Sequence, residues 1–414
     1  MNEKPSRGSL LVIFLTVFID LLGFGMVMPL LPIYADQFVL DESGWQLGLL
    51  MASFSAMQFF FAPLWGKLSD RIGRRPVLMV GLAGSVIFYS LFAFATIQKS
   101  LMLLFVARIG AGIAGATIST AQAYIADTTT TETRSKGMAL IGMAFGMGFT
   151  FGPLLGFLAV PSRDADPGPG PGIVAAILSA VAFCLAWFML PESKKDEDQK
   201  SQHRVFDFSA FSRALRIPSI GLILLTIFIC IFSFGNFETT LSLLIKKSTR
   251  EDSLGVFGFD WGQVCLSYAF IGFMLALVQG GFVRRMSGKV EDGHMAALGA
   301  VLEIAGFAVL VIAIKQVSGG LLFTALGIIV AGFAFLQPSL NAMLSRRSDP
   351  AQQGMVMGVG QSVSSLARIL GSGLGIPLLK YGKSLSTPYY VAAALMAVGL
   401  VMVLIASRRG SDFE

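Results

Sequence analysis

Five ionisable side chains stand inside long apolar runs of the sequence, where a charge is costly. They are Asp20, Arg108, Glu238, Glu303 and Arg368. Each would cost about 2.5–3.5 kcal/mol if it faced hydrocarbon, so we expect all of them to face protein or a water-filled cavity. The three acids could bind and release protons, whereas the two guanidinium groups stay charged and could serve as counter-ions or anion contacts.

Asp20 and Arg108 are predicted to lie at similar depths in a membrane. Asp20 is about 10 residues into its run from one side and Arg108 about 7 residues into its run from the other, so their heights differ by only about 5 Å in a layer about 30 Å thick. We interpret Asp20 as a site that binds a proton when its cation partner moves away. The alternative is a fixed ion pair that holds two helices together.

The other intramembrane charges admit similar alternatives. Glu303 is a second candidate proton site, or a residue that locks its helix to a neighbour through Arg368. Glu238 lies near one end of its run, where an exposed cavity mouth would also tolerate it. Polar residues in such runs could bind a substrate or could join helices by hydrogen bonds. The candidates for a substrate cavity are Gln122, Asn236, Glu238, Gln337, Asn341, Gln361 and Arg368.

Long membrane-spanning helices are needed to position these residues. Of the 414 residues, 54% are hydrophobic and 14% are charged, with a mean hydropathy of +0.73, whereas soluble proteins have about 25% charged residues. Twelve apolar runs between residues 10 and 406, each of about 19 to 28 residues, are long enough to cross a bilayer as helices. The sequence therefore predicts an all-α integral membrane protein with twelve spans and excludes a large soluble catalytic domain.

A polar segment divides the twelve runs into two sets of six. We predict an N-terminal six-helix half over residues 1–190, a cytoplasmic linker over 191–218 and a C-terminal half over 219–414. Such pseudo-repeats are typical of secondary transporters, with the substrate path between the halves. Apolar residues at near-helical spacing within the linker predict a short interfacial helix, with a solvated connector as the alternative.

Charge and cysteine placement set further expectations. Lysine and arginine gather in alternate connections, which predicts an inner-membrane protein with both termini in the cytoplasm. The cysteines Cys184, Cys230 and Cys265 lie in apolar runs, so neither a disulfide framework nor a metal site is expected. The usual motifs of hydrolases, metalloproteases and nucleotide-driven pumps are absent from the sequence. We therefore expect no enzyme activity, no cofactor, no metal and no nucleic-acid partner.

The most specific motif is GKLSDRIGRRP over residues 66–76, between the second and third apolar runs. It resembles the signature loop of the major facilitator superfamily and matches the pattern G-x-x-x-D-R-x-G-R-R. The resemblance implies a cytoplasmic latch in which Asp70 docks at the start of the eleventh helix, where a helix dipole favours an anion. The second half has only a partial echo, with Arg285 where the acid would stand. The implied latch residues are Gly66, Asp70, Arg71, Gly73, Arg74 and Arg75, with Asp127 as the acidic partner.

Two further segments resemble the tetracycline-exporter-type branch of drug:proton antiporters. The first reads DLLGFGMVMPLLP over residues 20–32. The second, in the fifth run, resembles the antiporter motif of that branch and contains Gly148, Gly152, Pro153 and Gly156. Arg108 also resembles the family's arginine motif, which is associated there with proton transfer, and Glu303 matches the place of a family acid. The acid in helix 3 and the histidine in helix 8 of the tetracycline exporters have no counterpart, so tetracycline itself is not the expected substrate.

These features together predict a proton-coupled secondary active transporter that exports amphiphilic organic compounds or drugs by alternating access. Its expected partners are a small organic substrate, protons and membrane lipid, and we expect a monomer powered by the proton gradient. The alternative is a symporter that imports a sugar, an organic acid or another small metabolite.

Overall fold

The computed structural model describes residues 7–31, 34, 44–129, 131–160, 168–193, 218–247, 255–286, 289–348, 353–382 and 384–409. The predicted interfacial helix of the linker lies outside these residues, since the segment 194–217 is not described.

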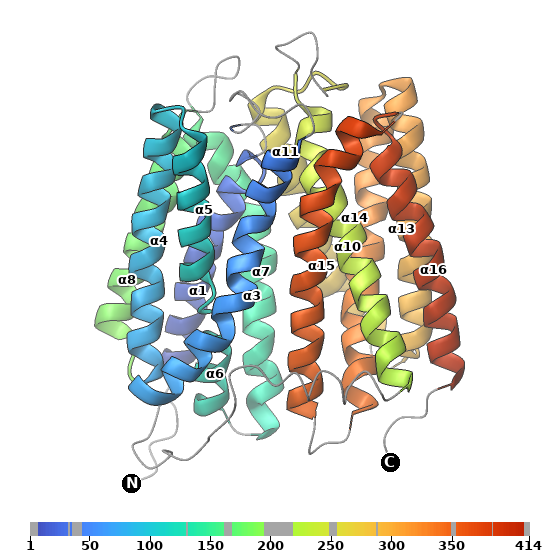
Figure 1. Ribbon diagram of the computed structural model, residues 1–414. Helices are drawn as coiled ribbons and strands as arrows, with labels where there is room; N and C mark the ends of the chain where they lie inside the picture. The colour runs from blue at the N-terminus through green and yellow to red at the C-terminus, as the bar shows by residue number, and fades with distance from the viewer. Residues whose placement is uncertain are drawn as a thin grey trace. The chain divides into compact units, whose positions relative to one another are not determined.

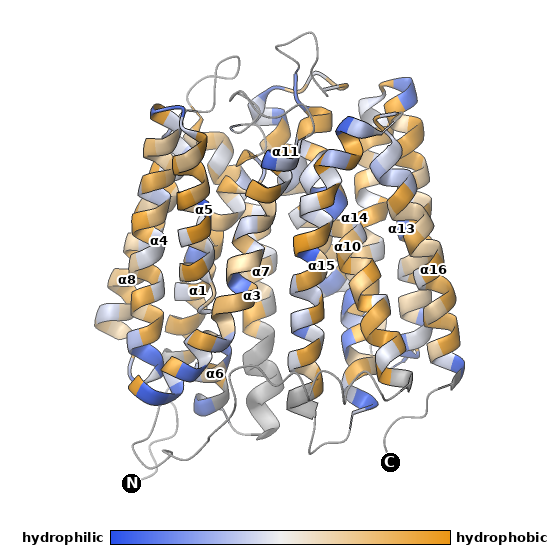
Figure 2. Ribbon diagram, in the orientation of Figure 1, coloured by the Kyte–Doolittle hydropathy of each residue, from blue (hydrophilic) through white to orange (hydrophobic). Residues whose placement is uncertain are grey.

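The described chain is helical throughout. Among these residues, 11 helices are long and apolar enough to cross a membrane, and Met143–Ala159 is a shorter apolar helical stretch at the place of the fifth predicted span. Figure 2 shows hydrophobic residues along the helix bodies and hydrophilic residues gathered at several helix ends. The described residues contain no β-strand beyond a single bridge between Lys246 and Phe259. The prediction of an all-α integral membrane protein is confirmed.

The chain forms two compact units, each built from helices that lie side by side (Figure 1). Unit 1 holds residues 1–38, 53–206 and 261–272, and unit 2 holds residues 39–52, 207–260 and 273–414. The helices of unit 1, with α3 and α11 each shared between the two units, are α1 (Arg7–Val27), α3 (Trp45–Ile72), α4 (Arg74–Ile97), α5 (Leu101–Gly115), α6 (Ile118–Thr128), α7 (Thr131–Ala159) and α8 (Gly170–Met189).

The second set of helices belongs to unit 2, apart from the first part of α11, which belongs to unit 1. They are α10 (Pro218–Ile245), α11 (Trp261–Leu277), the π-helical turn η1 (Val278–Val283), α12 (Arg284–Met286), α13 (Asp292–Gln316), α14 (Gly319–Arg346), α15 (Gln353–Tyr381) and α16 (Thr387–Arg409). The fourth helix of each half begins at a serine cap: Ser100 Oγ accepts from Leu103 N–H, and Ser318 Oγ accepts from Leu321 N–H.

One predicted span is divided in the structure. The run over residues 101–126 is not a single helix, because α5 ends at Gly115 and α6 begins at Ile118. The segment before the break is rich in glycine, including Gly110, Gly112 and Gly115, and glycine is a poor helix former. The hydropathy pattern could not show this break, because both sides of it are apolar.

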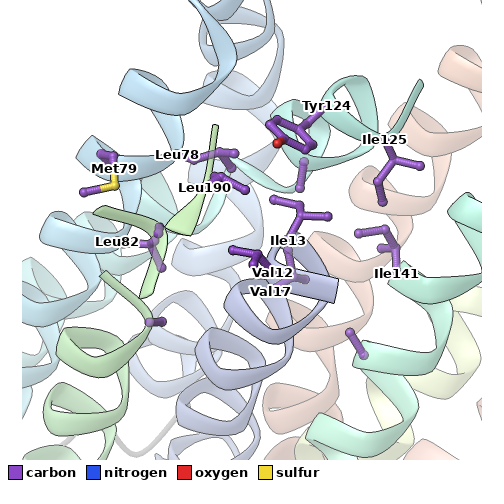
Figure 3. Packing of buried hydrophobic residues seen from close by; sticks show 14 of the residues in the cluster. Val12, Ile13, Val17, Leu78, Met79, Leu82, Tyr124, Ile125, Ile141 and Leu190 are labelled. Atoms are coloured by element: carbon purple, nitrogen blue, oxygen red, sulfur yellow. The ribbon is translucent and has the colours of Figure 1, made fainter. Parts of the chain in front are cut away.

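The core of unit 1 is a cluster of aliphatic side chains around Tyr124 (Figure 3). It combines Ile13 of α1, Leu82 of α4 and Ile141 of α7 with Leu190, which follows the end of α8. Tyr124 is fully buried, and its hydroxyl donates a hydrogen bond of 3.0 Å to the carbonyl of Pro191. This hydrogen bond from the Tyr124 hydroxyl holds the chain in place where it leaves α8.

Candidate functional site

The signature segment is mostly helix rather than loop. The structure corrects the expectation of a loop over residues 66–76, because α3 continues to Ile72 and only Gly73 separates it from α4. A Cβ atom on Gly66 would meet nothing within 4 Å, so no close contact demands a glycine there. Gly73 has φ of +102°, a conformation that side chains other than glycine rarely adopt. The turn between α3 and α4 therefore depends on Gly73 and not on Gly66.

Glu192 occupies the space beside Gly73 and binds the start of α4. Its Oε1 accepts the backbone N–H of Arg74 at 2.8 Å, and its Oε2 accepts that of Arg75 at 3.1 Å. A Cβ atom on Gly73 would clash with this carboxylate, so glycine is favoured by space as well as by φ. An anion at a helix N-terminus is favoured by the free N–H groups and by the dipole.

Arg74 is the centre of the polar network at this end of unit 1. Its side chain lies 2.5 Å from Asp70 Oδ1 and 2.9 Å from Asp127 Oδ2. The Arg74 guanidinium also donates to Ser69 Oγ at 2.7 Å, and Ser193 Oγ donates to Asp127 at 3.3 Å. The structure thus brings together three of the predicted latch residues. The docking of Asp70 on the eleventh span, α15 of unit 2, stays a prediction.

The remaining latch residues lie around this centre. Arg75 donates to the carbonyl of Trp187 at 2.5 Å, which ties the start of α4 to the end of α8. Arg71 is exposed in the last turn of α3. In the second half, Gly281 of the partial echo lies in the π-helical turn η1 and Arg285 in α12, while Gly288 is outside the described residues.

Asp20 is half-buried in α1 with hydroxyl partners instead of a cation. Ser179 of α8 donates to its Oδ1 at 3.4 Å, and Ser85 of α4 is a second hydroxyl partner. No ion pair joins Asp20 to Arg108, although both residues are described. Hydroxyl groups can bind either protonation state of a carboxyl group, whereas a fixed guanidinium would hold it ionised.

Arg108 is enclosed in α5, where it is 4% exposed. Its guanidinium lies 4.6 Å from the centre of the Phe54 ring, and its Nε has no hydrogen-bond partner. A cation over an aromatic face is stabilised without a counter-charge. The structure therefore shows no ion pair between Arg108 and Asp20, the acid with which the sequence paired it.

Glu303 is fully buried in α13, at its crossing with α14. A Cβ atom on Gly332 of α14 would lie 2.7 Å from Glu303 Cγ, so the two helices meet closely at this residue. Among the described residues, neither carboxyl oxygen has a hydrogen-bond partner and no cation lies within ion-pair distance. The alternative pairing with Arg368 is not seen. A carboxyl group without a partner is costly to bury in such a place.

Arg368 of α15 instead interacts electrostatically with Glu238 of α10. Both side chains are half-buried. Asn236, two residues earlier in α10, is fully buried and donates to the carbonyl of Pro388 at 3.3 Å, while its Oδ1 has no partner among the described residues. Asn236 is therefore a contact between α10 and α16 with one acceptor left over.

The other substrate-cavity candidates fall on three helices. Gln337 and Asn341 are half-buried on one face of α14, on either side of Pro338. Gln361 of α15 is exposed, as is Gln122 of α6 in unit 1.

The glycines of the predicted antiporter motif form a close helix crossing. A Cβ atom on Gly25 of α1 would lie 2.5 Å from the carbonyl oxygen of Gly148, and one on Gly152 would lie 2.8 Å from Gly25. Gly156 would meet Met26 at 3.2 Å, and Pro153 lies inside the same helix, α7. Small residues at this spacing allow helix backbones to touch.

The sequence matches the family model described as Major Facilitator Superfamily over residues 13–372. The chain belongs to the Major Facilitator Superfamily. Its members are transporters, so this chain is a multi-pass membrane transporter for small molecules and not an enzyme. The resemblance seen in the signature segment is confirmed.

Relatives narrow the place of the chain within the Major Facilitator Superfamily. It is 33% identical to the class C tetracycline resistance protein of Escherichia coli over 98% of both chains. It is also 30% identical to the mouse major facilitator superfamily domain-containing protein 10, over 90% of this chain and 87% of the relative.

Solved transporter structures are also similar to this chain. The human organic anion transporter MFSD10 (TETRAN) aligns with a TM-score of 0.72 and 25% identity over 97% of this chain and 100% of that one. A D-xylose-proton symporter, at 16% identity over 98% of both chains and a TM-score of 0.76, shares the fold.

Sequence reasoning missed two residues of this site. Glu192 was assigned only to a linker, and the sole signal for it was a lone acid directly after an apolar run. Tyr89 of α4 has no sequence signal of its own; it is 5% exposed and its ring packs against Gly23 of α1, three residues after Asp20.

Proposed function

We propose that this protein is a proton-coupled exporter of amphiphilic organic compounds, working by alternating access in the inner membrane with both termini in the cytoplasm. The observation that carries the proposal is the pair of intramembrane acids that lack a fixed cation. Asp20 has hydroxyl partners, and Glu303 has none. Carboxyl groups kept without a counter-charge in a costly environment are suited to bind and release protons.

The comparisons support the export direction. A relative named as a tetracycline resistance protein is 33% identical over nearly the whole chain, and a transporter of organic anions has a similar structure. We propose an amphiphilic organic substrate on these grounds. The antiporter-like motif of α7 supports export as well, and its Gly148 forms the tight crossing with Gly25 of α1. Import of a metabolite remains the competing function.

Reconstitution separates the two directions. Purified protein in proteoliposomes is loaded in turn with ethidium and with carboxyfluorescein, one cationic and one anionic amphiphile, and a proton gradient is imposed. We expect movement of at least one dye against the direction of proton flow, and we expect a protonophore to abolish it. Gradient-driven accumulation of D-xylose or an organic acid together with protons, without movement of either dye, would overturn the export proposal.

The Asp20→Asn variant tests the coupling residue. The amide cannot release a proton, so gradient-driven dye movement should be lost while dye exchange without a gradient persists. Glu303→Gln is the matched variant in unit 2. Undiminished proton-driven transport in both variants would show that neither acid carries the proton.

A further inference from the structure

Tyr89 stands one helical turn beyond the contact between Asp20 and α4. Ser85, which precedes Tyr89 by four residues, is a hydrogen-bond partner of Asp20. Gly23, which follows Asp20 by three residues, faces the ring: a Cβ atom there would lie 3.3 Å from Tyr89 Cε2. Residues three or four apart share a helix face, so α1 and α4 present two matched levels, Asp20 with Ser85 and Gly23 with Tyr89.

The packing of α5 on α4 fixes the level of Arg108. Gly110 of α5 faces Phe88, and Gly84 of α4 faces Ala114, so the two helices run antiparallel and residues 88 and 110 are level. Arg108 is therefore level with about residue 90 of α4, roughly 7 Å beyond Ser85 at 1.5 Å per residue. Tyr89 lies between the level of Asp20 and the level of Arg108.

The surroundings of Tyr89 leave few other charged partners. By the helix packing, Asp20 of α1 and Arg108 of α5 lie at the levels on either side of its ring, and among the described residues of α8 Ser179 places a hydroxyl on Asp20. No carboxylate among the described residues lies within ion-pair distance of Arg108. Because its ring lies at the intermediate level, the phenol is a polar group placed to connect these two charges.

We infer that Tyr89 is a positioning residue that transmits the protonation state of Asp20 to Arg108. A phenol hydroxyl can both donate and accept. When Asp20 is ionised, the Tyr89 O–H donates to it; when Asp20 holds a proton, the hydroxyl turns and its oxygen accepts from Arg108. The proton itself stays on Asp20 or leaves it directly. This inference rests on the proposed coupling role of Asp20.

The test measures the pH midpoint of gradient-driven dye transport in Tyr89→Phe. The ring is kept, and the lost O–H was a donor to the ionised acid, so the midpoint should move upward by about one pH unit. Tyr389→Phe, which removes the hydroxyl of a fully buried tyrosine in α16, is the matched control and should leave the midpoint unchanged. An unchanged midpoint in Tyr89→Phe would overturn the inference.

A second pair of variants tests the same inference if the Tyr89→Phe protein does not accumulate in the membrane. Tyr89→Gln keeps a donor and an acceptor and should hold the midpoint near wild type, whereas Tyr89→Leu should move it upward. Equal midpoints in the two variants would overturn the inference.

Asp20→Asn separates the two proposals. If it abolishes coupling while Tyr89→Phe has no effect on the midpoint, the inference fails and the proposed function stands. If Asp20→Asn transports with full coupling, both fail. In the Asp20→Asn background, Tyr89→Phe should add no further change, because coupled residues are not additive.

Discussion

The guanidinium of Arg346 lies 3.1 Å from the carboxylate of Asp292, and this pair joins the end of α14 to the start of α13. In unit 1, Arg74 and Asp127 join the start of α4 to the end of α6 at 2.9 Å. These are the corresponding positions of the two halves, with the charges exchanged. Because helix N-termini favour anions and C-termini favour cations, the unit 2 pair agrees with the helix dipoles and the unit 1 pair opposes them.

This difference predicts unequal stability effects of the same change. Asp292→Asn removes an acid whose side chain is 6% exposed from a helix N-terminus, and should destabilise the protein by about 1–3 kcal/mol. Asp127→Asn removes an acid that is 30% exposed from a C-terminus and should cost under about 1 kcal/mol. Thermal unfolding of the purified variants in detergent measures both. A greater loss in Asp127→Asn would contradict the dipole argument.

Glu192 should stabilise the start of α4 as a capping residue does. Glu192→Ala leaves the N–H groups of Arg74 and Arg75 without their acceptor and should cost about 0.5–2 kcal/mol in thermal unfolding. Glu291 directly precedes α13 but makes no capping hydrogen bond, so Glu291→Ala is the matched control and should cost less. Similar losses in the two variants would refute a capping role for Glu192.

The sequence predicted the helices well because their signal is local. Long apolar runs interrupted by polar segments identify spans without knowledge of any contact. It predicted ends poorly: Lys67, Asp70 and Arg71 suggested a loop, yet they occupy the last turns of α3, since charged side chains at a membrane surface do not oblige a helix to end.

The contacts of the site depend on tertiary packing, so they could not be predicted from the sequence. Glu192 binds Arg74 across 118 residues of chain, a separation at which no spacing rule operates. The positions of Asp20 and Arg108 along their apolar runs predict similar heights in the membrane. Those positions could not show that Tyr89, on a third helix, lies at the level between them.

The α1–α7 crossing predicts a sharp difference between two glycines of the same helix. Gly152→Ala would place a methyl group 2.8 Å from the backbone of Gly25, forcing the helices apart at a cost of about 1–3 kcal/mol and slowing transport. Gly146→Ala, where nothing lies within 4 Å, should be neutral or slightly stabilising. Thermal unfolding and dye transport, measured together, check this. Equal behaviour of the two variants would exclude a tight crossing.

Glu303 offers a test of whether a residue is kept for function at the expense of stability. Its carboxyl group is fully buried without a hydrogen-bond partner, so Glu303→Leu removes an unsatisfied polar group and fills a similar volume. The free energy of unfolding should rise by about 1–3 kcal/mol while proton-driven transport falls.

Glu303→Gln is the control for this prediction. The amide has nearly the same shape as the protonated acid but stays polar and cannot titrate, so transport should fall without a gain in stability. If Glu303→Leu is instead less stable than wild type, the carboxyl group has a partner that holds the fold together. If both variants transport normally, Glu303 has no part in coupling, and Asp20 alone must supply the titrating group.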